Sequence, residues 1–367
     1  MASSVGTSRP LQSVTITPGG PQRSARRLLD ASLGGREATE GIRQDKGTGG
    51  ETGRTDQSRR MMSHFCVLSA TEQEQEIALA ELWALSGIEG CGRVVRVPRQ
   101  VDVERAAYVT TCAELLAHGS CPETLAQQLA VTRPTFERFR VTLLTLPPRP
   151  EINSQRAIVE VAKHVYGTVD LRTPLNELLL VGTQAEWHFG RVVSRTARSY
   201  AAHEHKPHQF SSALPARVSR AMVNLAARPG DTVVDPCCGI GSILLEAWAA
   251  GMRAVGGDLN PKLAGMTRAN LSHFGRPPWV CVADAGRPWT RADAVVTDFP
   301  YGRQSPRTPQ LYERLLGNFP SLAPRLVLVT AAEVGGLLDE AGYDVLRAVG
   351  VPKHDGFTRR VYVAQVR

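Results

Sequence analysis

Four aspartates in the second half of the chain each end a short apolar run. They are Asp235 in TVVD, Asp258 in AVGGD, Asp284 in WVCVAD and Asp298 in ADAVVTD. A carboxylate at such a position can accept hydrogen bonds from hydroxyl or amino groups and can pair with a cation. A single acid could equally well solvate a strand end or cap the next helix. Four acids in series favour a ligand site.

The first of these acids begins a glycine-containing loop in the segment VVDPCCGIGSILLEA. Gly239 and Gly241 allow a tight turn and the close approach of a ligand, and Ser242 is predicted to cap the following helix. The dinucleotide fingerprint is not met, because Leu244 stands where its third glycine belongs, and no P-loop lysine follows. An acid at this loop suits the ammonium group of a methionine moiety, whose carboxylate the helix N-terminus would attract.

The second and third acids complete a set that fits one cofactor. Asp258 follows Asp235 by 23 residues, close to the spacing at which a carboxylate accepts both ribose hydroxyls. Asp284 is expected beside the amino group of an adenine. A nucleoside that carries an amino acid in place of phosphates is S-adenosylmethionine. Its predicted binding residues are Asp235, Pro236, Gly239, Gly241, Ser242, Asp258, Leu259, Asp284 and Ala285.

The fourth acid begins the tetrapeptide Asp298-Phe299-Pro300-Tyr301, which is predicted to be catalytic. The exocyclic amino nitrogen of a base is a weak nucleophile, because its lone pair is delocalised into the ring. If Asp298 and the main-chain carbonyl of Phe299 accept its protons, the lone pair can attack a methyl group. Pro300 would stiffen the turn and Tyr301 would stack on the base. The displacement needs in-line placement of nitrogen and methyl, and no metal ion.

The elements that position these residues begin near residue 231. Five β-branched runs alternate with helical stretches, which indicates a parallel sheet covered on both faces. Such a sheet binds ligands beyond the carboxyl ends of its strands. The last two runs, DVLRAVGV and RRVYVAQV, are joined by KHDGFT, which is too short for a crossover helix and predicts an antiparallel hairpin. Upstream, the patterns predict a helix over 74–87, a helix among the short strands near AAYVTTCAELL, a strand over 139–146, a helix over 154–164 and a strand over 187–193.

The segment 207–247 closely resembles the tRNA guanine-N2 methyltransferases that join a THUMP domain to a class I methyltransferase fold. The tetrapeptide resembles their Asp/Asn-Pro-Pro-Tyr motif, with Phe299 in place of the first proline. In this family the segment that matches Pro215, Arg217 and the pair Asn224-Leu225 packs beside the cofactor, so Pro215 joins the predicted cofactor-binding residues. VDLRTPLNELLLV, over 169–181, resembles the end of a THUMP domain, an RNA-binding module.

The resemblance implies an α/β fold with a Rossmann-like class I methyltransferase sheet and an antiparallel C-terminal hairpin. Together with the polar composition of the first sixty residues, it divides the chain into a disordered extension (1–61), an α+β region with a THUMP-like domain (62–195) and a methyltransferase domain (196–367). The implied reaction is methylation of guanosine N2 in tRNA. Methylation of rRNA, DNA adenine or protein glutamine, and a non-catalytic RNA-binding module, remain alternatives, and the need for an activator subunit stays open. The predicted RNA-binding residues are Arg149, Arg172, Arg191, Lys206 and Arg303.

Composition is compatible with a cytoplasmic RNA enzyme. The chain has 43 Lys and Arg against 35 Asp and Glu, a net charge of +8, and residues 1–60 contribute +4 of it (10 basic, 6 acidic). No apolar run is long enough to span a membrane. Seven cysteines without a C-x-x-C pair indicate reduced thiols and no zinc site, with Cys237 and Cys238 filling space. The cluster His203, His205 and His208 around Lys206 is predicted to be a solvated, RNA-facing segment.

Overall fold

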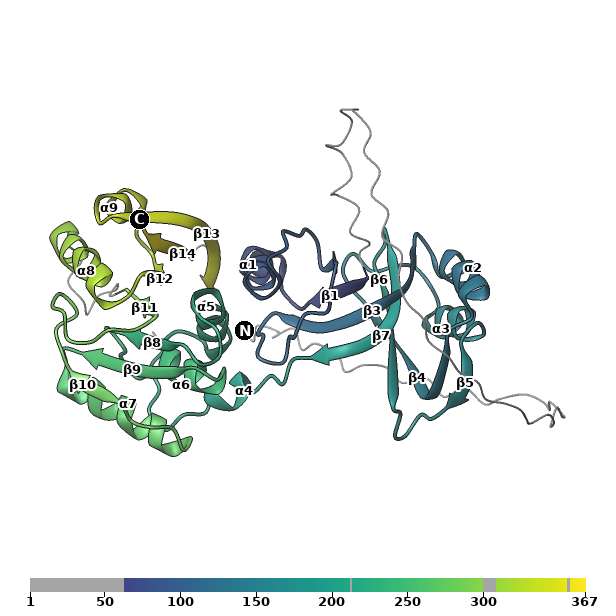
Figure 1. The fold of residues 1–367 in the computed structure, drawn as a ribbon, viewed down its shortest axis with the longest axis horizontal. Helices are drawn as coiled ribbons and strands as arrows, with labels where there is room; N and C mark the ends of the chain where they lie inside the picture. The colour runs from purple at the N-terminus through teal and green to yellow at the C-terminus, as the bar shows by residue number, and fades with distance from the viewer. Residues whose placement is uncertain (1–62, 212, 300–307, 355–356) are drawn as a thin grey trace, which may run out of the picture.

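The computed structural model describes residues 63–211, 213–299, 308–354 and 357–367. These residues form two seven-stranded sheets, one built from the chain before residue 196 and the other from the chain after residue 231 (Figure 1). The predicted extension over 1–61 lies outside the described residues. No helix in the described ranges is long and apolar enough to cross a membrane.

The first sheet is mixed and has the strand order β2-β1-β3-β7-β6-β4-β5. Helices α2 and α3 pack on it through an apolar cluster that includes Leu125, Ile158 and Phe189. The helix predicted near AAYVTTCAELL is wrong, because β3 runs through this segment and pairs with β1 on one side and β7 on the other. The elements are β1 (His64–Leu68), η1 (Glu72–Glu74), α1 (Gln75–Ser86), β2 (Val94–Val97), β3 (Val109–Gly119), α2 (Pro122–Thr132), β4 (Thr135–Thr145), α3 (Ser154–Ala162), β5 (Tyr166–Val169), β6 (Asn176–Gly182) and β7 (Trp187–Arg195).

The second sheet has the order β10-β9-β8-β11-β12-β14-β13. Strands β8 to β12 are parallel, whereas β14 is antiparallel to both β12 and β13. The predicted parallel sheet with an antiparallel C-terminal hairpin is therefore confirmed. Its elements are α4 (Tyr200–His203), α5 (Ala216–Ala226), β8 (Thr232–Asp235), α6 (Ser242–Ala249), β9 (Arg253–Asp258), α7 (Pro261–His273), β10 (Val280–Val282), β11 (Ala294–Asp298), α8 (Pro309–Leu322), β12 (Arg325–Thr330), α9 (Gly335–Glu340), β13 (Tyr343–His354) and β14 (Phe357–Val366).

Alternate residues of this sheet face two separate cores. Val233 and Val296 pack with residues of α5, α6 and α7, whereas Val234 and Val295 pack with residues of α8 and α9. Period-two alternation with apolar residues on both faces is what a sheet covered by helices on both sides requires. The helices thus leave the carboxyl edge of β8, β9 and β11 as the place where polar side chains gather.

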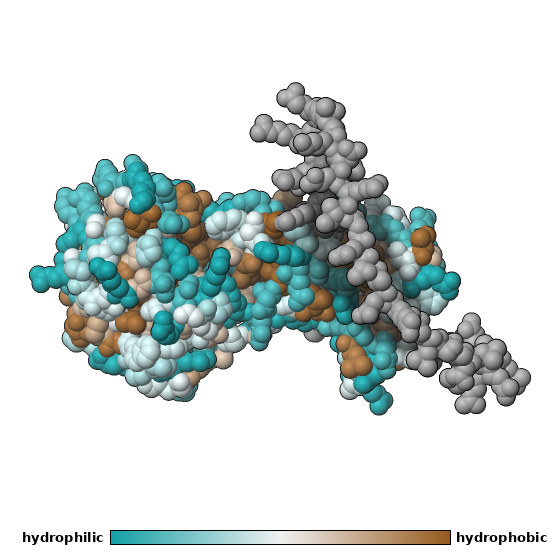
Figure 2. Space-filling model, viewed as in Figure 1, coloured by the Kyte–Doolittle hydropathy of each residue, from teal (hydrophilic) through white to brown (hydrophobic). Residues whose placement is uncertain are grey.

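The core on the α5 side continues into the first half of the chain. Helix α1 contacts both α5 and β13, and its Ile77 and Leu82 belong to the same buried cluster as Met222 of α5. The buried Glu81 accepts hydrogen bonds from the main-chain N–H groups of residues 107, 108 and 109 and from Asn224 Nδ2, at 2.7 to 3.2 Å. The two halves form a continuous surface in the space-filling view (Figure 2).

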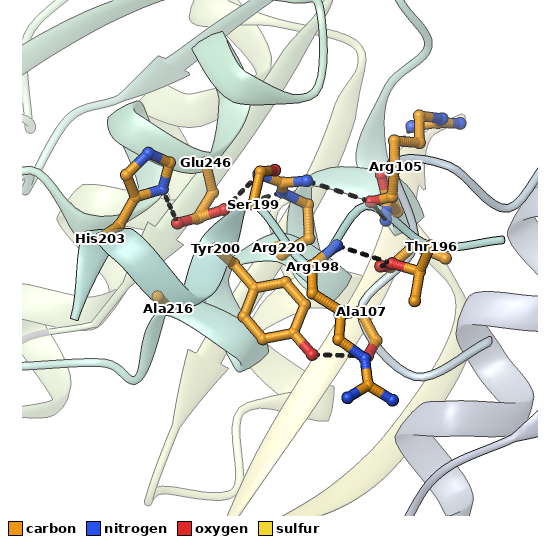
Figure 3. A network of polar contacts seen from close by, with 12 residues as sticks. Arg105, Ala107, Thr196, Arg198, Ser199, Tyr200, His203, Ala216, Arg220 and Glu246 are labelled. Atoms are coloured by element: carbon orange, nitrogen blue, oxygen red, sulfur yellow. Dashed lines mark hydrogen bonds and ion pairs between the residues drawn. The ribbon is translucent and has the colours of Figure 1, made fainter. Parts of the chain in front are cut away.

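A second buried polar cluster lies where the chain passes from one half to the other (Figure 3). Glu246 of α6 is fully buried and pairs with Arg220 of α5 at 2.7 Å and with His203 Nδ1 of α4 at 2.5 Å. Arg220 also donates to Ser199 Oγ (3.1 Å) and to the main-chain oxygen of Arg105 (3.3 Å). One carboxylate therefore ties three helices to the connecting segment.

The predicted solvated segment around residue 206 is wrong for two of its members. His203 is 6% exposed, and the ring of Phe274 packs against its imidazole at 4.8 Å between centroids. Lys206 is 5% exposed, its Nζ donates to the main-chain oxygen of His203 (3.4 Å), and burial lowers the pKa of its amine. The segment folds onto α6 and α7, which covers these two side chains, whereas His205 stays exposed.

Candidate active site

Three of the four predicted acids lie at the ends of neighbouring strands. Asp235, Asp258 and Asp298 end β8, β9 and β11, and β8 lies between the other two. Burial raises the pKa of the Asp235 carboxyl group, and the charges of Asp298 and Asp258 raise it further. The carboxyl edge of the sheet is thus a strongly acidic site that suits a cation.

Asp235 is the most deeply buried of these acids, at 2% exposure. Its Oδ1 accepts hydrogen bonds from Thr297 Oγ1 (2.9 Å) and from the main-chain N–H of Cys237 (3.1 Å). Burial nevertheless raises the pKa of Asp235 to about 8. A buried carboxyl group that ionises with difficulty alone is stabilised as a carboxylate when a cation such as an ammonium group arrives. The hydrogen bond from Thr297 comes from the neighbouring strand β11 and was not predicted from the sequence.

The glycine loop after β8 has the predicted backbone. Gly239 and Gly241 have φ of 54° and 83°, and a Cβ on Gly241 would lie 2.7 Å from Thr267 Cγ2. Asp258 Oδ2 accepts from Gly239 N (2.9 Å), and its Oδ1 accepts from Asn260 N (2.8 Å). Because each carboxylate oxygen has two lone pairs, Asp258 can hold the loop and still accept from a ligand hydroxyl.

The predicted capping role of Ser242 is wrong. Gly241 in the left-handed conformation is the N-cap of α6, so Ser242 is the first helical residue and its hydroxyl cannot reach back to cap the helix. Its Oγ is buried and has no hydrogen-bond partner among the described residues. An unsatisfied hydroxyl beside the N–H groups of a helix N-terminus is suited to a carboxylate. This donor set, which follows the buried Asp235 by one loop in the chain, fits an amino acid moiety.

The remaining predicted cofactor residues differ in their surroundings. Asp284 accepts from Gly286 N (2.9 Å) and pairs with Arg314 of α8 (2.9 Å), and these contacts lower the pKa of its carboxyl group. Arg314 was not predicted, since it lies 30 residues further along the chain. Leu259 is 69% exposed directly after β9, which leaves an apolar side chain free for an adenine ring. Pro236 and Ala285 are buried, and Pro215 is exposed.

Two residues that the family resemblance associates with the cofactor face the first half of the chain instead. The guanidinium of Arg217 lies 4.1 Å from the ring centroid of Tyr108 and donates to the main-chain oxygen of Ala107 (3.3 Å). Asn224 donates to Glu81. Helix α5 therefore uses these side chains to hold the two halves together.

Phe299 is fixed in place by contacts that a proline could not make in full. Its N–H donates to the main-chain oxygen of Val329 on β12 (2.9 Å), and its ring is 1% exposed. The ring packs against Tyr312 and Phe319 of α8, with centroids 5.1 and 5.8 Å away. These contacts hold the main chain directly after Asp298, which is half-buried. Pro300, Tyr301 and Arg303 lie outside the described residues.

The other predicted residues are spread over the molecule. Arg149 and Arg172 are exposed, whereas Arg191 forms a two-pronged pair with Glu114 at 2.7 and 2.9 Å. Lys206 is buried, as described above, so the prediction that it contacts RNA is wrong. Burial raises the pKa of the Cys237 and Cys238 thiols, which fits space-filling roles. The described residues contain no group of three or more His, Cys, Asp or Glu side chains that could hold a metal ion.

Replacing Asp235 by asparagine is expected to have opposite effects on stability and on ligand binding. The folded chain holds the Asp235 proton up to about pH 8, whereas the unfolded chain loses it near pH 3.9. This carboxyl group therefore favours folding at low pH, and that contribution is lost as the pH rises from about 4 to about 8. Because asparagine cannot ionise, Asp235→Asn should raise the Tm of the ligand-free protein at pH 8 and leave it nearly unchanged at pH 4.

If Asp235 binds the ammonium group of S-adenosylmethionine, as the sequence predicts, the same substitution should weaken binding of this cofactor about tenfold or more, because the cation would lose its carboxylate partner. Thermal unfolding at the two pH values and calorimetric titration with the cofactor measure both effects. A lower Tm at pH 8, or unchanged cofactor affinity, would contradict the role given to Asp235.

The chain is similar to known methyltransferases over the part that holds this site. Residues 204–334 match the family model described as RMKL-like, methyltransferase domain. The chain is 25% identical to the tRNA (guanine(10)-N2)-dimethyltransferase of Methanothermobacter thermautotrophicus, over 80% of this chain and 97% of the relative. A 78-residue stretch, 21% of this chain and 22% of the relative, is 40% identical to an uncharacterised S-adenosylmethionine-dependent methyltransferase of Mycobacterium tuberculosis.

Among solved structures, the chain resembles TrmN from Thermus thermophilus. The TM-score is 0.46 and the sequence identity is 24%, over 83% of this chain and 100% of that one. The match to the Methanothermobacter relative covers 80% of the chain, so it includes the glycine loop and part of the region before it.

Proposed function

We propose that this chain, whose residues 204–334 match the family model described as RMKL-like, methyltransferase domain, methylates the exocyclic N2 amino group of guanosine in tRNA. The observation that carries the proposal is the position of Asp298, at the end of β11 and next to the strand that ends in Asp235. Three curated relatives of this chain are tRNA (guanine(10)-N2)-dimethyltransferases, and the alignment with one of them covers 80% of the chain, so it extends into the region before the methyltransferase domain.

S-adenosylmethionine supplies the methyl group when bound. The residues that would hold it are Asp235 for the ammonium group, Ser242 and the N-terminus of α6 for the carboxylate, Asp258 for the ribose hydroxyls, and Asp284 and Leu259 for the adenine. Asp258 already holds the glycine loop at 2.9 Å, so the ribose site and the loop share one side chain.

Asp298 is the proposed acceptor of the guanosine amino protons. The carbonyl of Phe299 is the second acceptor, and its position follows from the main-chain hydrogen bond to β12 and the buried ring. With both protons accepted, the nitrogen lone pair is directed at the methyl group and positive charge on the nitrogen is reduced as the bond forms. The proposed roles of Pro300 and Tyr301 remain those predicted from the motif.

We assign RNA binding to the first half of the chain. The proposed division into an extension (1–61), an α+β region with a THUMP-like domain (62–195) and a methyltransferase domain (196–367) keeps one sheet in each of the last two parts. Exposed Arg149 and Arg172 are the proposed phosphate contacts among the described residues. A cytoplasmic location follows from this substrate, and it remains a prediction.

One experiment separates this function from its rivals. Methyl-labelled S-adenosylmethionine is offered with unmodified tRNA, rRNA, DNA and protein, each at matched concentration. Label in tRNA that digests to N2-methylguanosine supports the proposal. Label only in rRNA, DNA or protein would show that the labelled molecule, and not tRNA, is the substrate. Cofactor binding without transfer to any of the four would indicate a non-catalytic RNA-binding module.

A further inference from the structure

A buried asparagine of α7 joins the glycine loop to the segment that enters the methyltransferase domain. Asn270 is 0% exposed and lies inside a helix, where asparagine is unfavourable because its side chain competes with the backbone for hydrogen bonds. A buried amide in such a position must have its polar atoms satisfied. The partners that satisfy it therefore identify what the residue does.

Three hydrogen bonds use one lone pair of the amide oxygen and both N–H groups of this side chain. Oδ1 accepts from the main-chain N–H of His208 (2.9 Å), while Nδ2 donates to the main-chain oxygens of His208 (3.0 Å) and Ile240 (2.9 Å). Ile240 stands between Gly239 and Gly241 in the glycine loop, and His208 lies in the segment 204–211 that precedes α5. One side chain thus bridges two backbone segments that are separated by about 30 residues.

A second polar side chain of α7 acts on the adjacent peptide of the same loop. Thr267, three residues earlier on the helix, donates from Oγ1 to the main-chain oxygen of Gly239 (2.6 Å). Helix α7 therefore fixes two consecutive carbonyls of the loop. Because a trans peptide places C=O and N–H on opposite sides, fixing the Gly239 carbonyl toward α7 directs the N–H of Ile240 away from that helix.

We propose that Asn270 is a positioning residue that couples the cofactor loop to segment 204–211. It holds the loop in the conformation that binds the cofactor, and it ties that conformation to the chain that arrives from the first half of the protein. Because such coupling is reciprocal, a ligand that orders the loop also orders segment 204–211, and loss of order in this segment weakens binding of the ligand. This inference rests on the cofactor part of the proposed function and is independent of which RNA is methylated.

The test compares two substitutions on the same face of α7. Asn270→Asp keeps the acceptor for His208 N–H and replaces the donor to both carbonyls by an oxygen. Thr267→Val is close in shape and removes the bond to Gly239 together with the long contact from Cys238 Sγ (3.9 Å), while the bonds of Asn270 stay in place. S-adenosylhomocysteine serves as the probe, with its Kd measured by calorimetry and the hydrogen exchange of segment 204–211 measured with and without it.

In the parent protein, S-adenosylhomocysteine is expected to slow exchange in segment 204–211 as well as in the glycine loop. Asn270→Asp should raise the Kd about tenfold and abolish the effect on segment 204–211. Thr267→Val should raise the Kd by a similar factor and leave that effect in place. Asn176→Asp is the matched control, since Asn176 Nδ2 also donates to a main-chain oxygen (Glu137, 2.8 Å) but lies in the first sheet.

Several results would overturn the proposal. One is an Asn270→Asp protein with the Kd and the hydrogen exchange of the parent. Another is a Thr267→Val protein in which the probe slows exchange of segment 204–211 no more than in Asn270→Asp. The last is a parent protein that binds the probe without any change in the exchange of segment 204–211. The measurement on the parent needs no variant, so it tests the proposed coupling even if Asn270→Asp does not fold. Failure of the parent to bind S-adenosylhomocysteine at all would instead contradict the proposed function.

Discussion

Asp298→Ala is expected to lower kcat for tRNA methylation by about 10²- to 10⁴-fold, the range that a well-placed proton acceptor contributes. The cofactor should still bind with an affinity within about threefold of the parent value, because its proposed contacts lie on β8, β9 and α6 and directly after β9 and β10, and none of them involves Asp298. The effect should therefore appear in kcat and in kcat/KM alike, as for an interaction made mainly in the transition state. Single-turnover methylation with saturating cofactor measures it directly.

Two further substitutions show whether the effect belongs to the carboxylate. Asp298→Asn keeps one oxygen acceptor and should retain more activity than Asp298→Ala, since the related motif accepts either residue. Asp344→Ala removes an acid of β13 whose side chain is 65% exposed, and should leave the rate unchanged. Methylation by Asp298→Ala at the parent rate would show that another group accepts the amino protons.

The second sheet could be predicted from the sequence because its signals are local. A strand that is buried on both faces reads as a continuous β-branched run, and its end is marked where the first polar residue appears, as at Asp235 and Asp258. The first half of the chain was harder to predict, because the sequence of β3 partly fits a helix and forms a strand only through pairing with β1 and β7. Pairing partners distant in sequence leave no local pattern.

The same distinction explains what was missed in the site. Thr297, Asn270 and Arg314 reach the acids or the glycine loop from other elements, and nothing in their own sequence surroundings marks them. Lys206 was misjudged because a polar neighbourhood in sequence says nothing about which helices cover it. Phe299 could be recognised as a departure from the family motif, but only the fold shows the hydrogen bond to β12 and the packing on α8 that hold it.

Glu246→Ala is expected to lower the free energy of unfolding by about 3–5 kcal/mol, because it leaves the guanidinium of Arg220 buried without its carboxylate. Arg220 is 1% exposed, and its other hydrogen-bond partners among the described residues are the hydroxyl of Ser199 and the main-chain oxygen of Arg105, which are both neutral. His203 loses the same partner. Urea unfolding, followed by circular dichroism, measures the change.

A surface pair and a double variant test this reasoning. Glu160→Ala breaks the exposed pair with Lys163 on α3 (2.6 Å) and should cost less than about 1 kcal/mol, since solvent screens that pair. Glu246→Leu combined with Arg220→Met removes both buried charges and should recover much of the loss, because the penalty comes from the unpaired charge and not from the absence of the bond. If the double variant is as unstable as Glu246→Ala, the cluster stabilises the protein by connecting α4, α5 and α6, and the desolvation argument is wrong.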